Sequence, residues 1–253
     1  MSDFSPDPWA KLRAATPARI ALGHAGVAVP TRASLDFQFA HARARDAVHS
    51  ELDVAALSQH LPGHQLLHVR SAAPSRAVYL RRPDLGRRLA EGQAGTLPHA
   101  PSDVLIVVAD GLSARAVQAH ASGVIDALVP QLKGLRLGPV VIAQQARVAI
   151  GDEIGAKIEA RLCVLLVGER PGLTVADSLG AYLTFAPQPG TRDSVRNCVS
   201  NIHAQGGLSH AQAAAKIAWL AQAALTLGLT GTGLKENAPQ IAGPGQGPEI
   251  APP

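Results

Sequence analysis

Aromatic residues are scarce in this chain and account for only 3% of its 253 residues. Hydrophobic residues of all kinds make up 47%, so the core must be aliphatic, built mainly from Ala, Leu, Val and Ile. A chain of this length can bury such a core as one large domain or as two modest ones. The shortage of aromatic rings also argues against a nucleic-acid surface, because such surfaces stack bases on rings.

Cysteines and long apolar runs are scarce as well. The two cysteines, Cys163 and Cys198, cannot form a CxxC redox pair or a four-cysteine zinc site, and they fit a reducing compartment. No apolar run approaches the roughly 20 residues of a membrane span, and the N-terminal stretch MSDFSPDPWAKL lacks the apolar core of a signal peptide. We therefore expect a soluble, cytoplasmic protein without a membrane partner.

Several motifs of self-sufficient enzymes are missing. No GxGxxG turn joins a strand to a helix, no GxxxxGK[ST] phosphate loop is present, and no GxSxG elbow encloses Ser113, whose expected role is to cap the following helix. His60, His64 and His68 are spaced by four, but Pro62-Gly63 interrupts the helix that would align them. We predict neither a metal site nor catalytic residues in this chain.

Charge gives no sign of a nucleic-acid partner. The formal net charge is +4, and the basic residues are dispersed along the sequence. The densest cluster is LRRPDLGRRL, which places Arg81, Arg82, Arg87 and Arg88 around a Pro-Asp helix start. A solvated or subunit-facing helix end is favoured over a DNA site.

The first hundred residues form a mainly helical region in this interpretation. TRASLDFQFAHARARDAVHSEL has a helical apolar period, with Thr31 able to cap it; the period runs through Leu35, Phe39, Ala42 and Ala47. ELDVAALSQHL predicts a short helix that ends before Pro62-Gly63. QLLHVRS and RAVYLRR could pair as short strands. The Gly/Pro-rich connector GQAGTLPHAPSD indicates a boundary between a region 1–100 and a second region 101–235.

From Asp103 onward, strands and helices alternate. VLIVVADG, GPVVIAQQ and RLCVLLVG predict buried strands. Helices are expected in residues 113–135, with a break or bend near Ser122-Gly123, in 151–160 and in 207–229. This alternation predicts an α/β fold with a doubly wound, mostly parallel sheet. The Pro/Gly-rich tail 236–253 is expected to be disordered.

Two strands end on residues suited to a ligand. Asp110-Gly111 and Gly168-Glu169 both follow buried strands, and ligands of such sheets bind at the carboxyl ends of the strands. Pro171-Gly172 restricts the loop after Glu169. The carboxylate would accept hydrogen bonds from a ligand edged with amide N–H groups or hydroxyls. An ion pair of Glu169 with Arg170 or another arginine is an equally good alternative on residue type alone.

Six segments in order carry a family resemblance: RPDLGRRL, VVADGLSARAV, RVAIGDEIG, LLVGERPGL, DSLGAYLTFAP and NCVSNIHAQGG. With them the chain resembles the small subunit of ethanolamine ammonia-lyase, an adenosylcobalamin-dependent enzyme, from about Trp9 to Lys235. The resemblance implies a Rossmann-like cobalamin-binding domain. It also implies a radical conversion of ethanolamine to acetaldehyde and ammonia.

The resemblance further implies which residues contact the cofactor. The family's cobalamin contacts carry over onto Val148, Glu169 and Cys198, and we add the strand-end residues as further candidates: Asp110, Gly111, Ser113 and Gly168. The family keeps the cofactor's own dimethylbenzimidazole on cobalt. His203 in NIHAQG is therefore not expected to be a metal ligand, and no residue of this chain is expected to be catalytic.

The resemblance implies a hetero-oligomer. A large subunit would bind ethanolamine and enclose the radical chemistry, so this chain is expected to be inactive alone. Relatives that enter bacterial microcompartments carry a longer N-terminal extension, so the short N-terminus here favours the free cytosol. An autonomous small-molecule enzyme on a doubly wound fold, and a non-enzymatic scaffold or nucleic-acid binder, are the alternatives.

Overall fold

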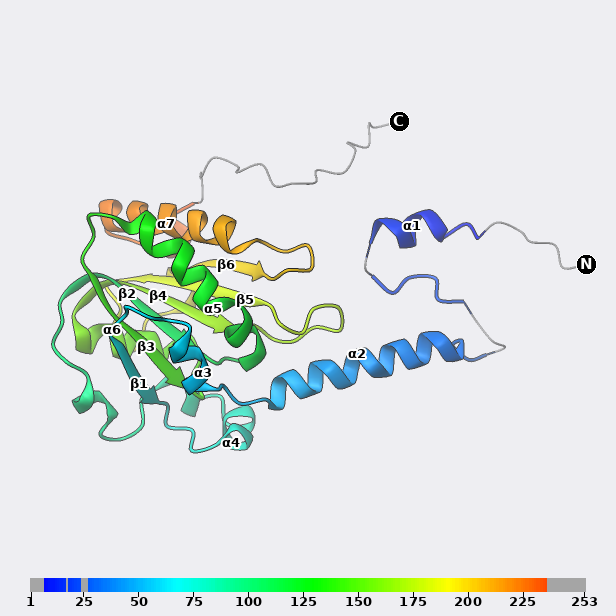
Figure 1. Ribbon diagram of the computed structural model, residues 1–253, viewed down its shortest axis with the longest axis horizontal. Coiled ribbons are helices and arrows are strands. Elements are labelled where there is room, and N and C mark those ends of the chain that lie inside the picture. The colour runs from blue at the N-terminus through cyan, green and yellow to red at the C-terminus, as the bar shows by residue number, and fades with distance from the viewer. Residues whose placement is uncertain (1–6, 17, 24–26, 236–253) are drawn as a thin grey trace, which may run out of the picture.

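The computed structural model describes residues 7–16, 18–23 and 27–235 and has an α/β fold built on one six-stranded sheet (Figure 1). The strand order across the sheet is β1-β3-β2-β4-β5-β6. The strands are β1 (Leu66–Arg70), β2 (Ser102–Ala109), β3 (Leu137–Gln144), β4 (Ala160–Gly168), β5 (Leu179–Phe185) and β6 (Asn197–Ile202). The predicted strands that became β2, β3 and β4 form its centre, as the β-branched runs indicated.

The helices are α1 (Ala10–Ala15), α2 (Thr31–His49), α3 (Val54–Gln59), α4 (Arg76–Arg81), α5 (Ala114–Leu128), α6 (Ile150–Ile158) and α7 (His210–Leu227). Short 3-10 turns lie at Leu85–Arg87, Gln93–Thr96, Val129–Leu132, Asp193–Val195 and Gly231–Gly233. Within the described ranges, no helix is both long enough and apolar enough to cross a membrane.

The sheet is mixed, because its strands change direction after β4. β1 pairs with β3, and β2 pairs with β3 and β4, all in parallel. β5 is antiparallel to β4, and β6 is antiparallel to β5. The reason lies in the connection 169–178, which holds no helix: a parallel return needs a long crossover, whereas a simple loop reverses the chain.

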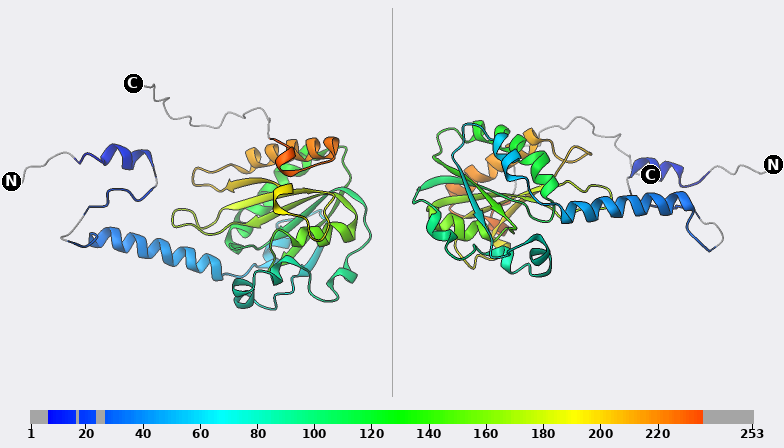
Figure 2. Two further views of the ribbon diagram at one scale, coloured as in Figure 1. Left: turned by 180° about the vertical axis from the view of Figure 1, so that it is seen from behind. Right: turned by 60° about the horizontal axis from the view of Figure 1, so that its bottom comes forward.

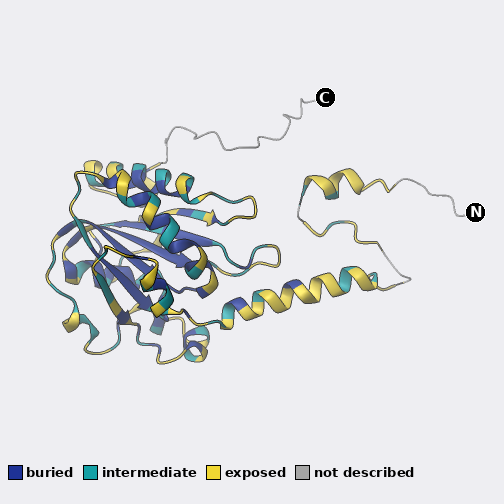
Figure 3. Ribbon diagram, in the orientation of Figure 1, coloured by how far each residue is buried: buried dark blue, intermediate teal, exposed yellow. Residues whose placement is uncertain are grey.

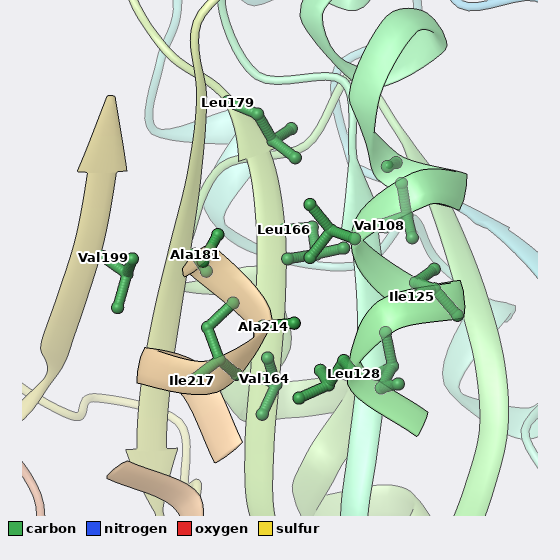
Figure 4. Packing of buried hydrophobic residues seen from close by; sticks show 14 of the residues in the cluster. Val108, Ile125, Leu128, Val164, Leu166, Leu179, Ala181, Val199, Ala214 and Ile217 are labelled. Atoms are coloured by element: carbon green, nitrogen blue, oxygen red, sulfur yellow. The ribbon is translucent and has the colours of Figure 1, made fainter. Parts of the chain in front are cut away.

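Apolar side chains cover both faces of the sheet. Along β2, Val104, Ile106 and Val108 belong to one buried cluster with α5 and α7, and the alternate residues of β2 belong to a second cluster with α6. Figure 4 shows Ile125 and Leu128 of α5, with Ala214 and Ile217 of α7, packed over Val164 and Leu166 of β4. The alternation is what a strand covered on both faces requires.

Helices α1 and α2 project from this body as an arm, defined here as the described residues from 7 to 49 (Figures 1 and 2). Most of α2 is exposed (Figure 3), and its buried residues are Ala40 and Ala47. Leu35 and Phe39 are 58% and 66% exposed. Of the predicted apolar stripe, Leu35, Phe39 and Ala42 therefore face solvent, and only Ala47, near the end of the helix, is buried.

Two predictions about the N-terminal half were wrong. RAVYLRR is not a strand but helix α4, which begins where the Ser75 hydroxyl accepts a hydrogen bond from the Val78 N–H at 3.4 Å. Thr31 does not cap α2; it is the first helical residue and follows Pro30 at the N-cap. β1 pairs with β3 rather than with 76–82. The short helix α3 and its end before Pro62-Gly63 are confirmed.

The expected break at Ser122-Gly123 was also wrong, because α5 runs through both residues. A Cβ at position 123 would overlap the His210 ring, so this glycine allows α5 and α7 to approach closely. The division into regions 1–100 and 101–235 is not a division of the sheet, since β1 belongs to both the first region and the sheet. The predicted disordered tail, 236–253, lies outside the described residues.

Candidate functional site

A cavity of about 420 Å³ opens at the carboxyl ends of β2, β3 and β4. This is the edge at which ligands of parallel sheets bind. Its walls come from seven separate segments of the chain: Tyr79, Arg87, Gly111, Leu112, Arg147, Val148, Val167, Gly168, Glu169, Arg170, Tyr182 and Asp193. Four predicted residues therefore meet here: Val148, Glu169, Gly111 and Gly168.

Glu169 is held at the cavity by its neighbours. Its Oε2 accepts hydrogen bonds from the Ser178 hydroxyl at 2.5 Å and from the Asn201 N–H at 3.4 Å. Its backbone N–H donates to the Ser178 carbonyl at 2.9 Å. Among the described residues Glu169 forms no ion pair, so the alternative of a Glu169–Arg170 pair is not realised.

The second carboxylate oxygen of Glu169 lies over a glycine in β5. A Cβ at position 180 would lie 2.8 Å from Oε1, so a larger residue there would displace the carboxylate from this position. No hydrogen bond within the described part of the chain uses Oε1. One oxygen therefore fixes the side chain, and the other stays available to accept from a ligand.

Gly111 and Gly168 allow the two strand ends to touch. Gly111 has φ +57°, and a Cβ at Gly168 would overlap the Ser113 carbonyl oxygen. The Leu112 N–H donates to the Gly168 carbonyl at 2.9 Å across this contact. The two glycines thus bring the backbone itself to the cavity wall, where a side chain would fill the space.

Asp110 and Ser113 lie beneath the cavity and not in its wall. Asp110 is 1% exposed and accepts from the N–H groups of Gln145 and Ala146 at 2.9 and 2.8 Å. Burial raises the pKa of Asp110, and these hydrogen bonds and nearby Arg76 oppose that rise. Ser113 caps α5 as predicted, by accepting from the Ala116 N–H. Both residues fasten the β2–α5 turn that carries Gly111.

Cys198 lies beside the cavity on the open face of β5 and β6. It is paired across the strands with Tyr182, which lines the cavity, and it is exposed. Partial burial of the Cys198 thiol raises its pKa, and a hydrogen bond from Tyr182 counteracts the rise. Burial likewise raises the pKa of Tyr182 to about 12. The pair offers a neutral, partly apolar surface continuous with the cavity.

Comparisons with known proteins show which family the chain belongs to. The family model for the ethanolamine ammonia-lyase light chain matches residues 6–235. The chain belongs to this family. A protein of Bradyrhizobium diazoefficiens named ethanolamine ammonia-lyase small subunit is 53% identical over 238 residues, with 91% of each chain covered. Similar proteins of the same name come from Azotobacter vinelandii (51% identical, 98% of this chain and 97% of that one) and Pseudomonas aeruginosa (49%, 96% and 92%).

Sequence reasoning missed Tyr79 and Arg147 of this light-chain site. Tyr79 is fully buried, and two guanidinium groups lie over its ring, with Arg76 at 5.0 Å and Arg147 at 5.3 Å from the ring centroid. Burial, and then the charge of Asp110, raise the pKa of Tyr79 to about 12. RAVYLRR contained the tyrosine, but the segment was assigned to a strand. No sequence signal links it to Arg147, which is 68 residues farther along the chain.

A buried ion pair beside the site was missed as well. Arg196 and Asp152, each with a side chain 2% exposed, make two hydrogen bonds of 2.6 and 2.7 Å. Arg196 also donates to the Thr184 hydroxyl at 2.7 Å and contacts Asp193 at 3.3 Å. Asp152 lies in the first turn of α6, where a carboxylate interacts favourably with the helix dipole. Its pairing with Arg196, the residue before β6, could not be read from spacing.

The histidines play no visible part in the cavity. His203 does not line it, and its Nδ1 accepts from the Gln205 N–H at 3.2 Å. Across residues 7–16, 18–23 and 27–235, no group of three or more His, Cys, Asp or Glu side chains could hold a metal ion. The cavity wall thus combines arginines, one carboxylate oxygen without a hydrogen bond, two aromatic side chains and close-packed glycines.

Proposed function

We propose that the chain is the small subunit of an adenosylcobalamin-dependent ethanolamine ammonia-lyase, a carbon–nitrogen lyase that converts ethanolamine to acetaldehyde and ammonia. In this proposal the sheet serves as a Rossmann-like support for the lower side of the cofactor. The large subunit binds ethanolamine and carries the catalytic groups. Family membership over residues 6–235 supports the activity, and the cavity at the strand ends supports the role of this chain.

The observation that carries the proposal is the convergence of Val148, Glu169 and Cys198. They come from three separate segments, yet two of them line one cavity and the third lies on the adjoining face of β5 and β6. The family resemblance implies all three residues as cofactor contacts without reference to their positions in the fold. An arbitrary selection of one exposed cysteine, one valine and one glutamate has no reason to meet at the ligand-binding edge of a sheet.

The residues present fit a cobalamin. Its rim of amide side chains supplies N–H donors, which match the unused Oε1 of Glu169. Val148, Tyr182 and Cys198 supply the apolar surface that its nucleotide side requires. A cavity of about 420 Å³ can hold only part of so large a molecule, which agrees with a cofactor shared between two subunits.

When bound, adenosylcobalamin supplies the carbon-centred radical chemistry, and the protein binds and orients it. Within this chain, Glu169 accepts hydrogen bonds at a fixed position, and the contact of Gly111 with Gly168 keeps the cavity floor rigid. The Tyr182 hydroxyl and the Cys198 thiol remain neutral near pH 7, because burial raises the pKa of both groups. No side chain of this chain needs to transfer a proton to substrate.

We also propose that the arm contacts the large subunit. Exposed apolar side chains collect there: Trp9, Leu12, Val29, Leu35, Phe37 and Phe39 are each more than 45% exposed. Leu35 and Phe39 lie one helical turn apart on the same face of α2. Such a stripe in a subunit of a hetero-oligomer is typical of an interface.

Mixing the purified subunits tests the division of labour. We expect no ammonia release from ethanolamine and adenosylcobalamin with this chain alone. We expect activity that saturates near equimolar large subunit. Turnover by this chain alone, at a rate comparable to that of the mixture, would contradict the proposal and favour the autonomous enzyme.

The arm is tested by the double substitution Leu35→Ser/Phe39→Ser. Burying each side chain is worth about 1.5–3 kcal/mol, so association with the large subunit should weaken roughly a hundredfold or more. Analytical ultracentrifugation measures the association. The matched control is Leu227→Ser at the end of α7, which is 60% exposed on the body and should leave association unchanged. Equal affinities for the double variant and the wild type would exclude this face.

A further inference from the structure

The cavity carries more positive charge than its own carboxylates neutralise. Three arginines line it, Arg87, Arg147 and Arg170, against the two carboxylates of Glu169 and Asp193. Asp193 is already engaged, because Arg196 contacts it at 3.3 Å and Arg87 approaches it at 3.9 Å. Glu169 accepts from Ser178 and Asn201, and among the described residues it pairs with no arginine. At least one guanidinium is left for a ligand.

Arg147 is the arginine without a carboxylate partner that is also partly buried. Its Nε has no hydrogen-bond partner although the atom is buried. No ion pair within the described ranges involves it. Buried donors are normally satisfied, and a buried charged donor left open is costly unless a ligand fills the site.

The position of Arg147 is fixed by the structure around it. Its guanidinium lies 5.3 Å from the ring centroid of fully buried Tyr79. Its backbone N–H donates to the Gly86 carbonyl at 2.8 Å. Position 86 must be glycine, because a Cβ there would lie 2.6 Å from the Tyr79 ring. This contact holds Arg87, the next residue, and Arg147 at the same wall of the cavity.

We propose that Arg147, assisted by Arg87, is an anion subsite that binds the phosphodiester of the cobalamin nucleotide loop. The inference rests on the proposed function and adds to it the part of the cofactor that this wall recognises. A guanidinium is suited to this task, because its fork of N–H donors matches two phosphate oxygens. Arg147 is then a specificity-determining residue: it distinguishes phosphate-bearing corrinoids from precursors without the phosphate.

Three corrinoids without the adenosyl group test the subsite: cobinamide, cobinamide phosphate and cyanocobalamin. Binding to the assembled two-subunit protein is measured by equilibrium dialysis for the wild type, Arg147→Gln, Arg147→Lys and Arg136→Gln. Arg136 is an exposed control, one residue before β3 and thus at the opposite end of the strand that leads to Arg147.

In the wild type we expect cobinamide phosphate to bind roughly tenfold more tightly than cobinamide, as one charge-assisted contact predicts. Arg147→Gln should abolish this tenfold difference in affinity and leave the affinity for cobinamide unchanged. Arg147→Lys should keep part of the affinity difference, because the positive charge remains. Arg136→Gln should show the same difference as the wild type. The Lys variant keeps the test decisive if the Gln variant does not fold.

Two outcomes would overturn the subsite. One is a wild type that binds cobinamide and cobinamide phosphate equally well. The other is an Arg147→Gln variant that weakens both ligands by the same factor, which would mark Arg147 as structural. If the wild type binds none of the three corrinoids, the proposed function itself fails, and the subsite fails with it.

Discussion

Asp152→Ala is the substitution whose effect the structure defines most sharply. It removes one partner of the buried Asp152–Arg196 pair, whose two hydrogen bonds are 2.6 and 2.7 Å long. Both side chains are 2% exposed, so water cannot replace the lost carboxylate. The guanidinium would stay buried with Asp193 as its only acidic contact, and that carboxylate is 70% exposed.

The expected cost follows from this geometry. Breaking a buried pair by removing one partner costs about 3–5 kcal/mol, and the remaining contact with Asp193 favours the lower end. In a chain of this size each kcal/mol lowers the thermal midpoint by about 2–4 °C, so we expect a fall of roughly 6–12 °C. Because Asp193 lines the cavity, corrinoid affinity should fall too.

Thermal unfolding followed by circular dichroism at pH 7 measures the change. Asp126→Ala, on the exposed side of α5, is the control and should shift the midpoint little. The double variant Asp152→Leu/Arg196→Met should recover most of the stability, because apolar replacements of a buried pair are often tolerated. A midpoint within about 2 °C of wild type for Asp152→Ala, less than 1 kcal/mol, would refute the reasoning.

Glu169→Gln should lower the corrinoid affinity of the assembled protein roughly tenfold, measured by equilibrium dialysis, because a charged acceptor is replaced by a neutral one; unchanged affinity would contradict its role. Gly168→Ala should lower the thermal midpoint, because overpacking costs about 1–3 kcal/mol and the added Cβ overlaps a backbone oxygen, whereas Gly95→Ala has free space and should not. Iodoacetamide should label Cys198 in the native protein, at a rate that rises with pH beyond the ordinary thiol pKa, since burial raises the pKa of this thiol. Buried Cys163, with a pKa raised to about 12, should react only after unfolding, and mass spectrometry distinguishes the two sites.

The central sheet could be predicted because its pattern is local. β2, β3 and β4 are continuous apolar runs rich in β-branched residues, and such runs are typical of strands that are buried on both faces of a sheet. Glycine positions were harder, because a glycine can end a helix or allow close packing. At Gly123 the second reason applies: α5 and α7 are brought together by residues 87 positions apart, and no local window contains both.

The site could be predicted only where it lies on strand ends or within a recognised motif. Glu169 follows a buried strand, and Val148 stands in a family motif, so the sequence points to both residues, and both line the cavity. Tyr79 and Arg147 come from segments with no marked pattern, and only the folded chain brings the guanidinium to the ring. Long-range pairs of this kind depend on tertiary packing and leave no trace in spacing or periodicity.

The placement of the tryptophans allows intrinsic fluorescence to follow both folding and assembly. Only two are present: Trp9 lies on the projecting arm and is 51% exposed, and Trp219 is half-buried against the α5–α7 face of the core. The fluorescence of Trp219 therefore reports unfolding of the body. A blue shift in the emission of Trp9 would indicate that another surface covers the arm and excludes water from this side chain. One label-free signal thus separates assembly from folding, once a Trp219→Phe variant isolates the emission of the arm.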